Sequence, residues 1–367
     1  MTTTSRSTPG RPGLRRRNLG ILAASAAAAS LLGACGSHHK VAAPPPTSTT
    51  LPPPTSTSTT QPPPPPVFPL TGLPATNPGQ VRAPAVVVKI DDVDAARPQE
   101  GIGQADVVYE EMVEGGLTRL AAVFQSDYPT VVGPVRSGRL TDEFIADDLN
   151  HPVYAFSGTN ADFLPILDSQ PVTPVNENNE PALFYRAGPH VAPDNLYSNV
   201  AALAQLSRTK TAPAPLFSYV ANGGQFGGPG GGPAGSIAIS FPAASIDWQY
   251  SAAAGGWVRD QNGTPDVDAA GHPIVATNVV VMFVNYVTSG MAVGEGVPPT
   301  PIPEGVLTGA GQAWFLSAGK IIRGTWSRSG LTTVATCKNL AGGPVSLTAG
   351  KTWIELVPTG EVPTVTP

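Results

Sequence analysis

Residues 85–92 read AVVVKIDD, and this stretch decides the fold of the first half of the chain. A run of apolar, mostly β-branched residues that ends at two aspartates is typical of a strand buried on both faces of a sheet. Residues 105–110 and 117–124 predict two further strands, and residues 153–156 predict a fourth. The first half of the chain is therefore expected to be built on a sheet.

Helical patterns alternate with these strands. Thr141 is expected to be the N-cap of a helix that continues through Leu149, because acidic residues fill its first turn. Residues 161–167 are helix-like, and Asp194 is expected to cap a helix over 196–206, where apolar residues follow amphipathic spacing. This mixture predicts an α/β or α+β domain.

The composition changes after this domain, which we place at residues 68–207. Residues 208–235 are rich in Gly and Pro and predict an interdomain linker or long loop. They do not form a phosphate-binding loop, because no Gly-Lys-Ser/Thr and no helix start follows. Residues 236–361 hold short apolar runs between turn residues, and Asn262-Gly263 suits a hairpin. This region predicts a mostly β domain, a small sandwich or barrel.

The N-terminus has the features of an export signal. Residues 1–34 contain five arginines and no acid, and residues 19–32 are apolar or small but too few to span a membrane. Leu32-Gly33-Ala34-Cys35 resembles the lipobox of bacterial lipoproteins. Residues 1–34 are thus expected to be a lipoprotein signal peptide, with lipidated Cys35 as the first mature residue. Arg16-Arg17-Asn18-Leu19 also resembles a twin-arginine signal, and a Sec signal fits as well.

Residues 35–67 follow as a Pro/Thr/Ser-rich stalk that holds 11 of the 42 prolines. Such a segment has too little apolar surface to fold and is expected to be disordered and polyproline-like. At ~3.1 Å per residue it could reach on the order of 100 Å from a membrane. The protein is therefore expected on the extracytoplasmic face of the cell membrane, anchored through Cys35. Glycosylation of the stalk is left open.

Charge and cysteine content limit the function classes. Without residues 1–34 the chain carries 16 basic and 26 acidic residues, the opposite of what a nucleic-acid-binding protein needs. Lipidation of Cys35 would leave Cys337 alone, so no intramolecular disulfide is expected. A single cysteine in this context is more typical of a partly buried strand or turn residue than of a nucleophile.

Charged residues concentrate in one region of the first domain. Arginines grip phosphate or carboxylate groups bidentately. Carboxylates act as acid and base or hold a divalent cation through oxygen ligands, although no spacing here identifies a metal. The alternative, which we favour, is a set of internal Arg–carboxylate pairs. The candidate ligand-binding residues are Asp91, Arg97, Glu110, Glu114, Arg119, Arg136 and Arg139.

Other residues carry weaker signals. Ser137 lies between a glycine and arginines but lacks the Gly-x-Ser-x-Gly elbow of a serine nucleophile, and it is expected to be a turn residue. Trp326 and Trp353 could stack on sugar rings, but tryptophans on strands are more often part of a core. No cofactor is identified.

Several sequence blocks occur in a fixed order along the chain. They are RPQ at 97–99 with Gly101, QADVVYE at 104–110, VEGGLTR at 113–119, GPVRSGR at 133–139, GTWSR at 324–328 and GKTWIE at 350–355. Together they resemble the YerB-like bacterial lipoproteins over about residues 70–360. The resemblance implies a two-domain envelope lipoprotein whose N- and C-terminal domains are both of unknown function. It implies no reaction, ligand or catalytic residue.

Two classes of function follow from these observations. The first is a non-enzymatic lipoprotein that binds a cell-envelope component or a partner protein through the acidic/arginine region. The second is an extracytoplasmic enzyme that acts on a phosphate- or sugar-bearing cell-wall polymer. The first is favoured, because five histidines and one spare cysteine assemble no nucleophile, metal triad or histidine dyad. One structural feature distinguishes the two classes. The enzyme hypothesis needs one open cleft, lined by Asp91, Glu110, Glu114, Arg119 and Arg136, and it loses its main support if these residues pair with one another beneath the surface.

Overall fold

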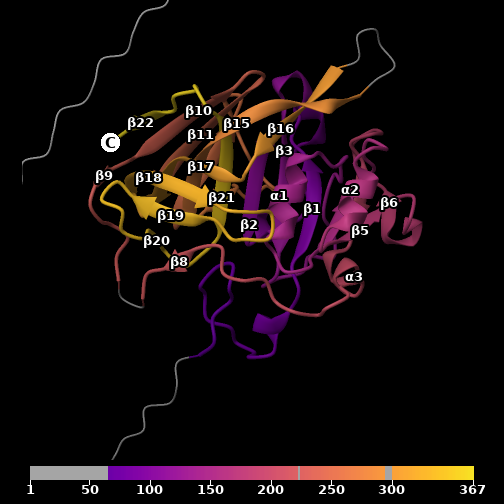
Figure 1. Ribbon diagram of the computed structural model, residues 1–367, viewed down its shortest axis with the longest axis horizontal. Helices are drawn as coiled ribbons and strands as arrows, with labels where there is room; N and C mark the ends of the chain where they lie inside the picture. The colour runs from indigo at the N-terminus through magenta and orange to yellow at the C-terminus, as the bar shows by residue number, and fades with distance from the viewer. Residues whose placement is uncertain (1–64, 222–223, 294–299) are drawn as a thin grey trace, which may run out of the picture. The chain divides into compact units, whose positions relative to one another are not determined.

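A computed structural model describes residues 65–221, 224–293 and 300–367 (Figure 1). The predicted signal peptide, Cys35 and almost all of the predicted stalk lie outside these residues. Within them, no helix has the length and apolar character needed to cross a membrane.

A large mixed sheet of twelve strands forms the centre of the structure (Figure 1). Its path runs β19-β18-β17-β15-β21-β2-β3-β1-β4-β5, with β16 added to β15 and β9 added to β18. The strands are β1 Val86–Asp91, β2 Val107–Met112, β3 Thr118–Phe124, β4 Val153–Phe156, β5 Thr173–Asn176, β9 Gly231–Pro233, β15 Asn278–Val293, β16 Thr300–Val306, β17 Gly309–Ser317, β18 Lys320–Arg328, β19 Thr336–Asn339 and β21 Thr352–Pro358.

Both halves of the chain contribute to this sheet. Strand β21 from the C-terminal half pairs in parallel with β2 from the N-terminal half, with Val107 opposite Thr352 and Glu110 opposite Glu355. At the N-terminal edge, β1, β4 and β5 are also parallel to one another. The sheet therefore continues from the first predicted domain into the second without interruption.

A second sheet of six strands packs on one side. It runs β13-β12-β11-β10-β22, with β14 added to β12. The predicted hairpin at Asn262-Gly263 joins β12 to β13, and both residues take the positive φ values that such a turn requires, 53° and 72°. The strands are β10 Ser236–Phe241, β11 Ala244–Ser251, β12 Gly256–Gln261, β13 Thr264–Pro265, β14 Val275–Ala276 and β22 Thr364–Thr366. Two small ladders pair β6 Phe184–Arg186 with β7 Leu196–Ser198, and β8 Ser218–Tyr219 with β20 Ser346–Leu347.

The described residues contain few helical segments, and the protein is mostly β. The helix content that the sequence predicts for the first half of the chain is therefore too high. The hydroxyl of Thr141 does not cap a helix but accepts a hydrogen bond from the Gly305 amide. Asp194 caps no helix either, because residues 196–198 form a strand and Asn199 caps the short helix that follows. The α-helices are α1 Thr141–Asp147, α2 Leu164–Ser169 and α3 Val200–Ala204, and the 3-10 helices are Gln80–Arg82, Asp94–Ala96, Ile102–Gln104, Glu114–Gly116 and Pro181–Leu183.

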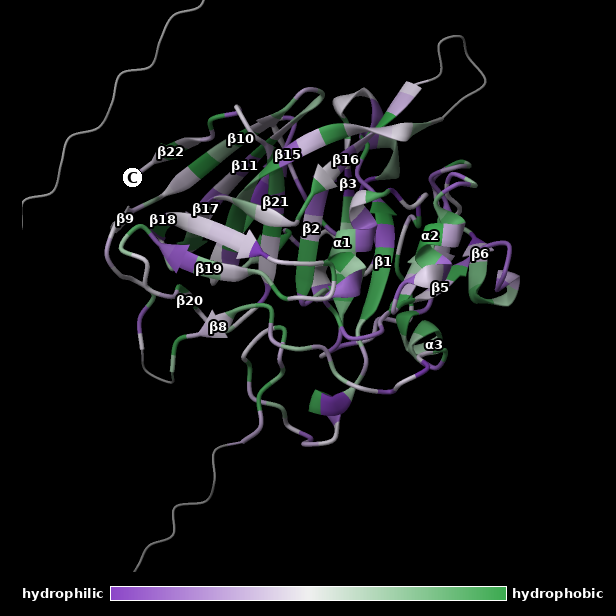
Figure 2. Cartoon of the chain, in the orientation of Figure 1, coloured by the Kyte–Doolittle hydropathy of each residue, from purple (hydrophilic) through white to green (hydrophobic). Residues whose placement is uncertain are grey.

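The large sheet carries a hydrophobic core on each face, because side chains alternate along each strand. On β1, Val86 and Val88 join the core shared with the six-stranded sheet, which holds the buried Trp248. Val87 joins the core on the opposite face, where α1 contributes Phe144. Figure 2 shows the resulting concentration of hydrophobic residues along the central strands. The continuous apolar run at the start of the first half is thus explained, because strand β1 is covered on both faces.

Candidate functional site

The charged residues predicted as one site lie on both faces of the large sheet. Glu110 points into the core between the two sheets, where it meets Arg259 of β12. Asp91 and Arg119 are opposite each other in the β1–β3 register and point to the other face. The predicted residues therefore form separate groups and do not line one cleft.

The group between the two sheets, the Arg259 cluster, consists of Arg259, Asp92, Glu110, Asp266 and Glu355. All five are at most 2% exposed. One guanidinium nitrogen of Arg259 lies 2.8 Å from Glu110 and 3.2 Å from Asp92, and the other donates to Asp266. Glu355 stands beside Glu110 across the β2–β21 pairing. One cation thus holds several acidic groups from both sheets.

Tryptophan N–H groups complete the Arg259 cluster. Trp248 donates to Glu355 at 2.7 Å, and Trp353 donates to Glu110 at 3.2 Å. Burial raises the pKa of Asp92 and of Glu355 well above the usual range, which favours their neutral forms and reduces the charge imbalance. The cluster joins the two sheets internally. The prediction that Glu110 binds a ligand is wrong, because its side chain has no exposed surface.

A second buried group, the Lys89 cluster, lies on the opposite face of the sheet. It consists of Lys89, Glu111, Asp142 and Tyr154, all without exposed surface. The ammonium of Lys89 donates to Glu111 and, at 2.9 Å, to Asp142. The Tyr154 hydroxyl donates to Asp142 at 2.5 Å. Burial raises the pKa of Glu111 to about 7. The sequence signal for this cluster is a lysine inside an apolar strand, and it indicates a structural ion pair.

The third group is partly exposed and lies where the parallel strands β1 and β4 end. Residues 134–138 insert between the ends of β1 and β4: the Arg136 amide donates to the Lys89 carbonyl, and the Ser157 amide donates to the Arg136 carbonyl. Arg136 is thereby fixed through its backbone to both strands. The carboxyl ends of parallel strands are where open sheets with parallel strands usually bind ligands. We call this group, made of Asp91, Arg119, Arg136, Ser137, Ser157 and Asp194, the Arg136 edge.

Three charged side chains surround Asp91 in the Arg136 edge. Arg136 donates to Asp91 through Nε, and the same atom lies 3.7 Å from Asp194. Arg119 Nε lies 3.9 Å from Asp91. Burial raises the pKa of Asp194, and its hydrogen bond with Asp91 raises it further. Burial, with neighbouring Arg139, lowers the pKa of Arg119 to about 10.

Arg136 is the most exposed arginine of this group. Its side chain is 26% exposed, against 10% for Arg119. Among the described residues, its hydrogen bonds use only Nε, so both Nη groups are available to a ligand. The hydroxyls of Ser137 and Ser157, 3.3 Å apart, lie on the same partly exposed surface. A phosphate or carboxylate group would find donors of the required kind here.

The remaining candidates are paired internally. Arg139 contacts Glu114 through Nη2 at 2.9 Å and is 7% exposed, so this pair offers little to a ligand. Arg97 donates to Asp94 at 2.6 Å and lies 3.8 Å from Asp266. The internal pairing that we favoured from the sequence is therefore found for these arginines.

The described residues assemble no cluster of three His, Cys, Asp or Glu side chains that could hold a metal ion. The carboxylates considered for a cation are kept apart, because Glu110 belongs to the Arg259 cluster and Glu114 is paired with Arg139, while Asp91 lies in the Arg136 edge. At the Arg136 edge, the partly exposed guanidinium of Arg136 and the hydroxyls of Ser137 and Ser157 are groups of the kind that bind anions.

Three weaker candidates have structural roles. Cys337 lies in β19, half-buried, and burial raises the pKa of its thiol to about 12, which is unfavourable for a nucleophile. Trp326 and Trp353 are 2% and 3% exposed and belong to the two cores, as expected for tryptophans on strands. Neither presents a face for a sugar ring.

Comparison with known proteins identifies the chain's relatives. It is 48% identical over 71 residues to a Bacillus subtilis (strain 168) protein named "Putative lipoprotein YerB", an alignment that covers 19% of this chain and only 21% of that protein. The crystal structure of YerB from Bacillus subtilis has the same fold, with a TM-score of 0.69 at 22% identity, and the match covers 82% of this chain and 99% of that chain.

Two family descriptions match in order along the sequence. "Protein of unknown function (DUF3048) N-terminal domain" matches residues 70–213, and "Protein of unknown function (DUF3048) C-terminal domain" matches residues 237–354. The first contains the Arg136 edge, and the second contributes Arg259 and the first three residues of β21. Both domains are present in that order, and the chain belongs to the DUF3048 family.

Proposed function

We propose that this protein is a lipid-anchored envelope protein that binds an anionic envelope component at the Arg136 edge. The observation that supports this proposal most is the position of Arg136 between the ends of two parallel strands. In the described part of the chain, neither of its Nη groups has a hydrogen-bond partner, so both can bind a ligand. A phosphate or carboxylate would engage this guanidinium bidentately, and the hydroxyls of Ser137 and Ser157 would add neutral donors. Such groups occur in charged cell-wall polymers, which are the ligand class that we infer.

The geometry supports binding better than catalysis. An enzyme that uses two carboxylates needs both beside the same substrate bond. Glu110 and Asp91 lie on opposite faces of the large sheet. Asp194 lies beside Asp91 and shares a hydrogen bond with it, and both carboxyl groups flank Arg136. These carboxylates hold the arginine in place, which is the arrangement of a rigid binding surface.

The Arg136→Ala variant tests the binding site. We expect the full-length protein in detergent micelles to bind a purified phosphodiester wall polymer, and the variant to bind it about 10- to 100-fold more weakly. That loss corresponds to the ~1.5–3 kcal/mol of a charge-assisted contact. Isothermal titration calorimetry at two salt concentrations measures it. Arg136→Lys should keep part of the affinity, since it keeps the charge but loses the bidentate geometry.

Arg208→Ala is the matched control, because Arg208 is exposed and lies outside the Arg136 edge. Its affinity should equal that of the wild type. If Arg136→Ala, folded by circular dichroism, binds the polymer as tightly as the wild type, the proposed site is wrong.

The anchor is the second part of the proposal. The name of the YerB relative supports it, together with the lipobox-like residues before Cys35. Two or three acyl chains on one cysteine hold a protein at a membrane, since each buried methylene adds ~0.8 kcal/mol. Cys35→Ala is expected to release the protein into the soluble fraction or to leave the unprocessed precursor. Fractionation and mass spectrometry check this, and a variant of mature mass that stays with the membranes would exclude the anchor.

A further inference from the structure

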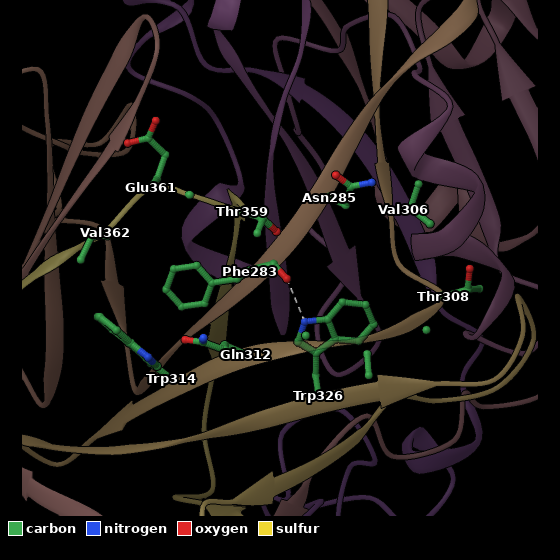
Figure 3. A pocket seen from close by; sticks show the side chains of 14 residues that line it. Phe283, Asn285, Val306, Thr308, Gln312, Trp314, Trp326, Thr359, Glu361 and Val362 are labelled. Carbon is green, nitrogen blue, oxygen red and sulfur yellow. Dashed lines mark hydrogen bonds between the residues drawn. The ribbon is translucent and has the colours of Figure 1, made fainter. Parts of the chain in front are cut away.

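A cavity of about 590 Å³ opens where two strands of the large sheet diverge (Figure 3). Strands β15 and β17 pair only over residues 278–282 and 313–317. Beyond this point β15 turns to β16, pairing from Asn285, while β17 continues along β18 as far as Gly309. The cavity, which we call the fork cavity, occupies the space between them and is closed on another side by residues 359–362.

The base of the fork cavity is held rigidly. Trp326 of β18 is 2% exposed, and its indole Nε1 donates to the Phe283 carbonyl at 3.1 Å, a bond visible in Figure 3. This bond links β15 to β18, the strand that pairs with β17. Gly311 makes the arrangement possible, because a Cβ there would lie 2.6 Å from both the Phe283 carbonyl oxygen and the Trp326 nitrogen. The fork is thus a formed feature of the fold.

Aromatic and polar side chains line different parts of the cavity. Phe283 and Trp314 are half-buried and meet edge to face, with ring centroids 5.2 Å apart and planes at 67°. The Arg323 guanidinium stacks over Trp314 at 4.9 Å and helps to fix the ring. The exposed amides of Asn285 and Gln312 face the same space, as Figure 3 shows.

The charge of the residues that line the cavity limits the classes of ligand that it can bind. Glu361 is the one ionisable residue of the described lining, and the guanidinium of the neighbouring Arg323 is engaged over the ring of Trp314, so the lining itself supplies no cation for an anionic group. Aromatic faces bind the C–H face of a sugar ring, and amide groups, which both donate and accept, bind its hydroxyls. We propose that the fork cavity binds a neutral saccharide unit, stacked on Phe283 and Trp314 and hydrogen-bonded by Asn285 and Gln312. This site shares no residue with the Arg136 edge and stands independently of the proposed function.

Titration of the full-length protein with a neutral trisaccharide of N-acetylglucosamine, and separately with maltotriose, tests the fork cavity. Saturation-transfer NMR detects the bound sugar, and calorimetry gives its affinity. At least one of the two should bind. We expect Trp314→Ala to weaken that binding about tenfold, which is the size of one aromatic contact. Trp314→Phe should retain most of it. Because Trp314→Ala could disturb folding, Gln312→Ala, a change on an exposed side chain, is the second variant and should also weaken binding.

Two control variants show whether the loss of sugar binding is specific to the fork cavity. Tyr185→Ala removes an aromatic that is 43% exposed elsewhere on the surface and should leave sugar binding unchanged. Arg136→Ala should also leave it unchanged, so failure of the Arg136 edge and failure of the fork cavity are distinguishable. The proposal is overturned if neither sugar binds the folded wild type, if folded Trp314→Ala and Gln312→Ala bind with wild-type affinity, or if a co-crystal structure shows a peptide strand along β17 in the cavity.

Discussion

Replacing Arg259 with methionine is expected to destabilise the protein by at least about 3–5 kcal/mol, the cost of breaking a buried ion pair by removal of one partner. Arg259 is the cation at the centre of a fully buried group with Asp92, Glu110, Asp266 and Glu355. Methionine fills similar space but leaves these carboxyls without a counter-charge. Since the group lies between the two sheets, the loss is expected to affect the whole fold.

Denaturant unfolding of the full-length protein at several pH values measures this effect. Burial already raises the pKa of Asp92 and of Glu355 in the folded state, and Arg259→Met removes the guanidinium that opposes this rise. Stability is therefore lost as pH rises through those values and recovers as the groups become protonated. The deficit relative to the wild type should be largest near pH 8 and smaller near pH 5. Arg208→Met, at an exposed position, should change stability by less than about 0.5 kcal/mol. An Arg259→Met protein as stable as the wild type at pH 8 would mean that this cluster does not tie the two sheets together.

Replacing Lys89 with methionine is expected to cost a similarly large amount, again about 3–5 kcal/mol, on the opposite face of the sheet. The ammonium of Lys89 is the cation between the fully buried Glu111 and Asp142. Its removal leaves Glu111, whose pKa burial already raises to about 7, with a still stronger tendency to be protonated.

A double-mutant cycle checks this interpretation. Glu111→Gln removes the charge that Lys89 neutralises, so the double variant Lys89→Met/Glu111→Gln should be more stable than Lys89→Met alone. The double variant should therefore lose less stability than the sum of the two single variants, and this difference should be largest above pH 7, where Glu111 is ionised. Additive effects of the two substitutions would contradict the proposed pair.

The sequence predicts the strands of this fold well, because they are marked locally. The strand predicted at residues 153–156 coincides with β4, and the apolar run at 85–90 lies within one residue of β1. The helices are predicted less exactly. The helix predicted from Thr141 is found as α1, although the Thr141 hydroxyl bonds the Gly305 amide and caps no helix. The helix predicted over 196–206 is replaced by strand β7 and the short helix α3, which Asn199 caps.

The candidate site is harder to predict than the strands. The sequence places the charged residues of 91–139 close together, but it does not show on which face of the sheet each one lies. The face on which each side chain lies depends on how the strands pair, and β2 pairs with β21, a strand that is distant from it in the sequence. Arg259, the partner of Glu110, is 149 residues away from it and shows no local signal beyond its position in a strand. Trp314 and the fork cavity carry no local signal either, because the divergence of β15 and β17 is a property of strand pairing.

Footprinting with phenylglyoxal tests the Arg136 edge most directly, because it reports which guanidinium groups a bound ligand covers. The full-length protein is labelled with and without a saturating phosphodiester wall polymer, and the rate at each arginine is read by mass spectrometry. Bound polymer is expected to slow labelling of Arg136 strongly and to leave the exposed Arg208 and Arg323 unchanged. Equal labelling of Arg136 with and without bound polymer, or protection only at Arg208 or Arg323, would contradict the proposed binding surface.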